Sequence, residues 1–239
     1  MSRVAYVFYS HSDYSDIWPI MLGQTNEYLK NQKKYIFTNT IGKYNFDGWQ
    51  VVLYDDSQPY KERVVHCLEE IEEEIVIFHH EDMFLLSEPK FSVIDDLISK
   101  VSIGKYDLIK FGRAQYTNSE PEQLETNLFK NPSNLSFAIQ PTIVSKKNIS
   151  KIYRATFGDT IWKFESNSCN FVNFTNLKSC FYCEETDKKR GMYHWDSGIY
   201  PYIATAVVKG KWDYECYSIE LSKLMDKYKI DPNVRGKNV

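Results

Sequence analysis

Acidic and histidine side chains that could do chemistry gather in two short runs of this 239-residue chain. The first run is His79-His80-Glu81-Asp82, and it follows the apolar residues Ile75 to Phe78. A run of β-branched and aromatic residues of this length is typical of a buried strand, and charges cannot lie inside such a strand without partners. We therefore expect the run to mark the strand's carboxyl end, where open α/β sheets bind ligands. Its carboxylates suit Mg²⁺ or Mn²⁺, and the alternative is a solvated turn.

The second run, His194-Trp195-Asp196, precedes the largely apolar stretch up to Gly210. The stretch predicts a helix over Asp196–Val208, with Gly210 as its stop. A carboxylate in a pocket can act as a general base towards a hydroxyl group, whose high pKa demands one. The alternative is that Asp196 only caps the helix.

Alternating apolar patterns predict the elements that would position both runs. The expected strands are Arg3–Tyr9, Lys34–Thr38, Gln50–Tyr54, the opening of Glu74–Leu86, Tyr106–Phe111, Ser136–Ile143 and Lys211–Tyr217. The expected helices are Asp16–Lys30, Tyr60–Glu72, Phe91–Val101, Lys146–Ala155, Asp196–Val208 and Ile219–Tyr228. Tyr116–Asn134 is expected to be a loop, and Thr156–Tyr193 has no clear period. Strand–helix alternation predicts an α/β fold with a mainly parallel central sheet, flanked by helices, in a single domain.

Composition narrows the function classes. The net charge is −3 and the basic residues are scattered, which argues against broad nucleic-acid binding. No apolar run approaches the roughly 20 residues that span a bilayer, so we expect no membrane span. The start MSRVAYVFYSHS does not resemble a signal peptide, and five cysteines fit a reducing compartment. The expected location is the cytoplasm.

Cysteine spacing leaves one structural alternative open. Cys180 and Cys183 form a CxxC pair, and Cys169 and His194 are the nearest further ligands for a zinc ion. Ordinary thiols are the competing interpretation.

The layout resembles that of GT-A fold glycosyltransferases, which use nucleotide sugars. His80-Glu81-Asp82 stands where that family has an Asp-x-Asp-like motif at the end of a strand, although His80 replaces the first Asp. The resemblance implies a divalent Mn²⁺ or Mg²⁺ held by Asp82, with Glu81 as a second ligand and His80 as a third. Asp196 matches the acidic catalytic residue of inverting members, with Trp195 and His194 lining the acceptor site. The alternatives for His194 are a hydrogen bond to the diphosphate or a place in the metal shell.

The same resemblance places the nucleotide at the end of the first strand. It implies contacts from Tyr9, Ser10 and His11, from Asp55 or Asp56 after the third strand, and from Arg63 in the next helix. Arg235, in the polar basic tail Lys229–Val239, would contact the diphosphate, and the alternative is a disordered terminus. Gln140-Pro141 and Lys110 to Arg113 would shape the acceptor side.

The expected function is thus transfer of a sugar from a nucleotide-diphosphate sugar, by family expectation a UDP-sugar, to a hydroxyl of a glycan or other acceptor. Residues 1–115 would bind the donor, 116–218 the acceptor, and 219–239 would form a terminal helix and tail. Direct displacement with Asp196 as base gives inversion. A retaining transferase and a non-catalytic nucleotide- or carbohydrate-binding protein are the alternatives. A sugar nucleotidyltransferase is disfavoured because no Gly-rich phosphate loop follows the first strand.

Overall fold

The computed structural model describes residues 3–113, 120–191 and 194–238. Its centre is a nine-stranded sheet in the order β3-β2-β1-β4-β8-β5-β9-β7-β6. Its strands are β1 Val4–Tyr9, β2 Lys34–Thr38, β3 Gln50–Leu53, β4 Ile75–His80, β5 Leu108–Lys110, β6 Gln123–Glu125, β7 Leu128–Lys130, β8 Thr142–Ser145 and β9 Ser179–Tyr182.

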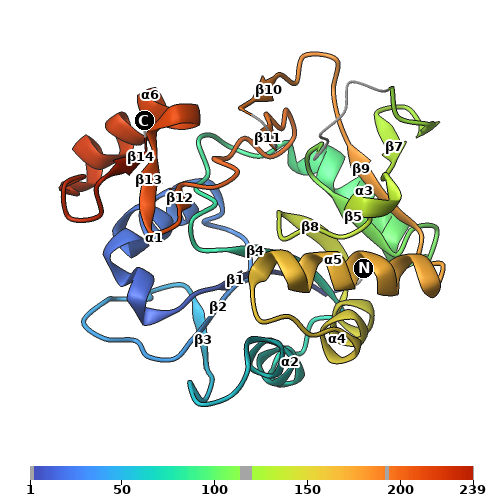
Figure 1. The fold of residues 1–239 in the computed structure, drawn as a ribbon, viewed down its shortest axis with the longest axis horizontal. Coiled ribbons are helices and arrows are strands. Elements are labelled where there is room, and N and C mark those ends of the chain that lie inside the picture. The colour runs from blue at the N-terminus through green and yellow to red at the C-terminus, as the bar shows by residue number, and fades with distance from the viewer. Residues whose placement is uncertain (1–2, 114–119, 192–193, 239) are drawn as a thin grey trace.

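Helices cover both faces of this sheet (Figure 1). The helices of the described residues are α1 Trp18–Tyr28, α2 Tyr60–Glu70, α3 Phe91–Ser102, α4 Lys146–Ala155, α5 Ile161–Phe174 and α6 Tyr214–Tyr228, with 3-10 turns η1 Ser12–Ile17 and η2 Ser133–Leu135. Side chains of α1, α3 and α6 share one apolar core with Tyr6, Phe8 and Ile77 of the sheet. Those of α2, α4 and α5 share the other core with Val7 and Val76. Successive strand residues thus alternate between two buried faces.

The remaining short strands lie outside the large sheet. A two-stranded ladder joins β10 (Lys189–Arg190) to β11 (His194–Trp195), and a three-stranded one orders β12 (Val207–Val208), β13 (Lys211–Asp213) and β14 (Lys237–Asn238).

The strands at the amino-terminal end follow the predicted alternation. β1 pairs in parallel with β2 on one side and with β4 on the other, and Tyr9 lies opposite His80. The chain builds outward from β1 through β2 to β3, and then crosses over to place β4 on β1's free side. The carboxyl ends of β1 and β4 therefore form a topological switch point, the usual ligand site of such sheets.

The sheet as a whole is mixed rather than mainly parallel. β8 runs antiparallel to both β4 and β5, and β7 runs antiparallel to β9. The predicted strand Ser136–Ile143 is wrong over its first six residues, because the strand begins at Thr142, immediately after Pro141, which lacks an N–H for a ladder. The predicted loop Tyr116–Asn134 contains the hairpin β6–β7, and its first four residues lie outside the described part.

The predicted helix Asp196–Val208 is also wrong. Pro201 interrupts it, and its backbone pairs instead with the segment after β4. The Leu86 N–H donates to the Pro201 carbonyl at 2.8 Å, Ile203 donates to Phe84 at 2.9 Å, and Ala206 donates to Asp82 at 3.1 Å. The segment is an extended strap along residues 82–86.

The carboxyl-terminal region differs from expectation in two further ways. The strand predicted over Lys211–Tyr217 ends at Asp213, because the Asp213 carboxylate accepts from the Cys216 N–H and caps α6. Residues 229–238 are ordered: β14 adds to β13, while Val239 lies outside the described part. Within the described residues, no helix is long and apolar enough to cross a membrane.

Candidate active site

Glu81 and Asp82 lie directly beyond β4, at the switch point. The Glu81 N–H donates to the Tyr9 carbonyl at 3.2 Å, which extends the β1–β4 pairing by one residue. The Asp82 carboxylate accepts from the Val207 N–H at 3.3 Å. The end of β1 and the strap thus hold the two acidic residues, which we call the carboxylate pair.

The electrostatics of the carboxylate pair favour a cation. Burial, and next the charge of Asp82, raise the pKa of Glu81 well above its usual range. Burial raises the pKa of Asp82 to about 6, against the opposing effects of N–H donors and Arg235. Two neighbouring carboxylates with so little compensation are costly when ionised.

The donor set of the pair fits a divalent ion that shares its remaining ligands with a substrate. Oxygen ligands suit Mg²⁺ or Mn²⁺, and Mg²⁺ commonly binds one or two carboxylates together with phosphate oxygens. Residues 3–113, 120–191 and 194–238 contain no group of three or more His, Cys, Asp or Glu side chains arranged to hold a metal. Other ligands would therefore have to come from bound phosphates or water.

Of the two histidines before the pair, His79 is buried and His80 is half-buried. His79 Nε2 lies 2.9 Å from the Tyr200 hydroxyl, and its ring packs on Phe8. His80 Nε2 lies 2.8 Å from the Tyr60 hydroxyl, which is 2.9 Å from that of Tyr153. Burial lowers the pKa of His79 to about 3 and that of His80 to about 4, so both are neutral. His80 is thus engaged in a tyrosine chain, which leaves the oxygens of the pair as the better metal ligands.

A polar cluster lies at the ends of β1, β2 and β3. His11 Nε2 lies 3.0 Å from both carboxylate oxygens of Asp56, and its Nδ1 accepts from the Asp13 N–H. The Arg63 guanidinium binds Asp56 at 2.9 Å, and Asn39 joins through Ser12. His11 and Arg63, both predicted for the nucleotide, are therefore brought together.

Three other residues predicted to contact the nucleotide are engaged in contacts with neighbouring protein groups. The Tyr9 ring stacks on Tyr54 with centroids 5.4 Å apart, and both are buried, so neither offers a free face to a base. Ser10 is fully buried and accepts from the Trp18 indole N–H at 2.7 Å. Asp55 accepts from the Ser57 N–H, and this holds its own turn.

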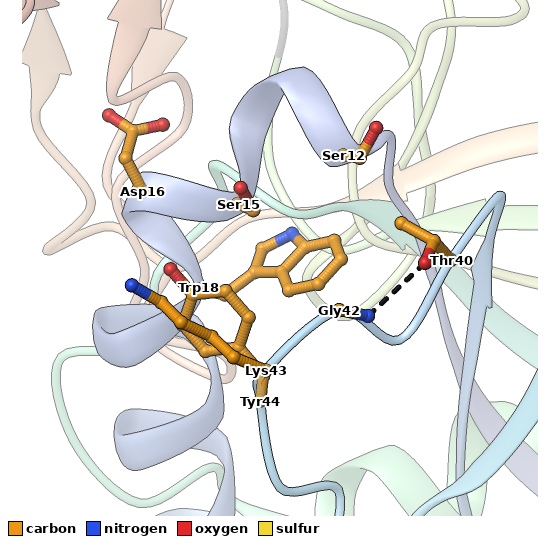
Figure 2. Close-up of a pocket in the computed structure, with 8 residues that line it drawn as sticks. All are labelled: Ser12, Ser15, Asp16, Trp18, Thr40, Gly42, Lys43 and Tyr44. Atoms are coloured by element: carbon orange, nitrogen blue, oxygen red, sulfur yellow. Dashed lines mark hydrogen bonds between the residues drawn. The ribbon is translucent and has the colours of Figure 1, made fainter.

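A pocket of about 470 Å³ opens beside this cluster, between η1 and residues 40–44. Figure 2 shows the Trp18 indole at its centre, between Ser12 and Thr40 at one end and Asp16 and Lys43 at the other. Trp18 itself is fully buried, so the surface open to a ligand comes from hydroxyl groups, the half-buried Tyr44, and the charges of Asp16 and Lys43. Such a lining suits a small polar ligand.

Arg235 connects this pocket with the carboxylate pair. Its guanidinium binds both Asp16 oxygens, at 2.6 and 2.5 Å, and lies over the Tyr14 ring at 4.8 Å. The same charge opposes the rise that burial causes in the pKa of Glu81 and of Asp82. The carboxyl-terminal tail therefore brings the Arg235 guanidinium close to the switch point.

Asp196 lies near the carboxyl end of β5, which is parallel to β9. The next residue, Ser197, donates to the Phe111 carbonyl at 2.5 Å, one residue beyond β5. Arg190 binds the Asp196 carboxylate at 2.8 Å and also binds Glu220 at 3.0 Å. Asp196 is 36% exposed and caps no helix, so it is an arginine-held carboxylate open to solvent.

The other predicted acceptor residues flank Asp196. The Arg113 guanidinium lies 4.4 Å from the centre of the Trp195 ring, a cation–π contact. Burial lowers the pKa of His194. Gln140 donates to the Gly112 carbonyl, whereas Lys110 is buried and its ammonium group donates to the Leu135 carbonyl. The proposed zinc ligands Cys169, Cys180, Cys183 and His194 form no metal group within the described part of the chain.

Sequence reasoning missed Asn39, Asp16 and Arg190. Asn39 follows a predicted strand and could have been found by the criterion that singled out Asp55. Asp16 and Arg190 have no such signal, because their roles depend on partners 219 and 6 positions away.

No protein-family model matches this chain, and no curated protein gives a significant match to it.

Proposed function

We propose that this protein is a GT-A-like glycosyltransferase that moves a sugar from a nucleotide-diphosphate sugar to a hydroxyl-bearing acceptor. The observation that carries the proposal is the carboxylate pair at the β1–β4 switch point, beside a polar pocket. Glu81 is buried and Asp82 is half-buried beside it, so a divalent cation would offset their charges. Mg²⁺ commonly binds one or two carboxylates together with phosphate oxygens.

On the donor side, the chain's residues would bind and orient the nucleotide sugar. The pocket hydroxyls and the His11–Asp56–Arg63 cluster would hold the nucleoside, and Arg235 would face the diphosphate. Glu81 and Asp82 would hold Mn²⁺ or Mg²⁺, which when bound offsets negative charge on the departing nucleoside diphosphate. Arg235 adds a fixed positive charge to the same region.

On the acceptor side, Asp196 would take the proton of the attacking hydroxyl. Its carboxylate is ion-paired with Arg190 at 2.8 Å, and this contact orients it. Trp195, fixed under Arg113, would provide an aromatic wall for a sugar ring. Attack opposite the leaving group then gives inversion at the anomeric carbon.

The test is a screen of nucleotide sugars for nucleotide release, with Mn²⁺ and a panel of glycan acceptors. Asp82→Asn and Asp196→Asn should each abolish most turnover. Asp226→Asn, at an exposed residue of α6, is the matched control and should retain it. Full activity in both site variants would refute the mechanism.

Two further measurements separate the alternatives. NMR of the product gives its anomeric configuration, and retention would remove the base role from Asp196. Calorimetric titration of UDP with and without Mn²⁺ tests the binding-protein alternative, which predicts binding independent of metal and no donor turnover.

A further inference from the structure

Exposed aromatic residues gather where α4 leads into α5. Phe157 is 70% exposed, Trp162 63% and Ile161 40%. The connection folds back on the helix: Asn167 donates to the Phe157 carbonyl at 2.6 Å, and Thr160 caps α5 by accepting from Lys163. The three apolar side chains therefore belong to one compact tip.

Basic side chains border this tip. Residues 146–163 contain five basic residues and one acidic residue, in a chain whose net charge is −3. Lys147, Lys151 and Arg154 recur at helical spacing on the exposed face of α4, and Lys163 is exposed in the first turn of α5. Glu69 of α2 pairs with Arg154. For the three lysines, the described residues provide no ion-pair partner within 4.0 Å.

This combination is the physical signature of an interfacial site. Trp and Phe prefer the headgroup level of bilayers, and lysines beside them are attracted to anionic lipids. Near an anionic surface each basic side chain is worth roughly a five-fold increase in binding. We propose that the α4–α5 surface, formed by Lys147, Lys151, Phe157, Ile161, Trp162 and Lys163, docks on an anionic phospholipid membrane without crossing it.

The orientation of α4 and α5 places the tip at the edge of the sheet that carries the candidate active site. α4 begins beside the start of β4, where the Lys146 N–H donates to the Glu74 carbonyl. It ends near Tyr153, whose hydroxyl reaches His80 through Tyr60. α5 then leads back to the start of β9, and Figure 1 shows the two helices together on one face of the sheet. A docked protein would present the edge with the carboxylate pair to molecules held at the lipid surface.

Co-sedimentation with vesicles tests this proposal without any nucleotide sugar, so its outcome is independent of the proposed enzymatic activity. The wild-type chain should bind vesicles of phosphatidylglycerol and phosphatidylcholine, and should bind pure phosphatidylcholine at least ten-fold less. Lys147→Glu with Lys151→Glu should weaken binding by more than 25-fold at low salt. Phe157→Ser with Trp162→Ser should weaken it at least ten-fold, with unchanged circular dichroism.

Phe174→Ser is the matched control, because Phe174 is 86% exposed at the opposite end of α5. It should bind as the wild type does. Brominated lipids should quench tryptophan fluorescence in the wild type and much less in Trp162→Phe. The proposal is overturned if the wild type ignores anionic vesicles, if it instead self-associates through Trp162, or if Phe174→Ser loses binding equally.

Discussion

The two acidic regions of the edge hold their charges in opposite ways. Glu81 and Asp82 are largely withdrawn from water, and Arg235 is a cation that acts on both of them. Asp196 stays partly exposed and has its own counter-charge in Arg190. A carboxylate pair whose pKa values are raised by burial favours a bound cation, whereas Asp196 already has an arginine counter-charge and stays within reach of solvent. In the proposed mechanism, this difference in setting, more than the residue type, would assign metal binding to the carboxylate pair and base catalysis to Asp196.

Among substitutions that test this difference between the two regions, the largest effect on turnover is expected at Asp196. Asp196→Asn removes the proton acceptor but leaves the hydrogen-bonding shape, so kcat should fall by about 10² to 10⁴. Donor KM and the affinity for Mn²⁺ should stay near wild type, because the carboxylate pair is untouched. Steady-state kinetics measure kcat and donor KM, and metal titration measures the Mn²⁺ affinity. A weakened Mn²⁺ affinity would show that Asp196 and the carboxylate pair belong to one site.

At the carboxylate pair, Asp82→Asn should weaken Mn²⁺ binding by about 10- to 100-fold. In the metal-free protein the same change should raise stability at pH 7.5 by about 1–3 kcal/mol, since burial holds the pKa of Asp82 near 6. A carboxyl with a raised folded-state pKa costs stability as pH rises from its unfolded-state value of about 4 to its folded-state value of about 6, so the gain should fall to about half at pH 5. Thermal melts at both pH values test this, and a destabilised variant at pH 7.5 would contradict it.

Arg235→Ala tests how much the Arg235 charge contributes to the setting of the carboxylate pair. Loss of the Asp16 ion pair should cost about 1 kcal/mol of folding free energy. Loss of the nearby charge should raise the pKa of Asp82 further and move the pH dependence of metal binding upward. Arg190→Ala is the control, since it lies beside Asp196 and should leave that dependence unchanged.

The smallest effect concerns His80. Tyr60→Phe removes the hydroxyl that bonds both His80 and Tyr153, and should cost about 1 kcal/mol of stability. Mn²⁺ affinity should not change, because His80 is engaged in the tyrosine chain. Tyr28→Phe, at a half-buried tyrosine of α1, is the comparison variant. A large loss of metal affinity in Tyr60→Phe would return His80 to the ligand set.

The local pattern of apolar residues was enough to predict the fold near the start of the chain. β1 to β4, with α1 and α2 between them, follow directly from apolar periodicity, as does the position of Glu81 and Asp82 at a strand end. The helix predicted after Asp196 failed because Pro201 and long-range pairing with residues 82–86 overrode a helical-looking composition. α5 within Thr156–Tyr193 had no clear signal because aromatic residues lie on its exposed as well as its buried side.

The strap, residues 196–208, which pairs with residues 82–86, has a consequence for how the protein is made. Asp82 and its N–H donor Val207 are 125 positions apart, so during synthesis on a ribosome the acidic pair emerges long before the segment that completes its surroundings. Loops of that length close slowly. A nascent chain stalled before residue 199 would therefore carry both carboxylates yet have no finished site, and the proposed transferase activity should appear only as the last few dozen residues are added.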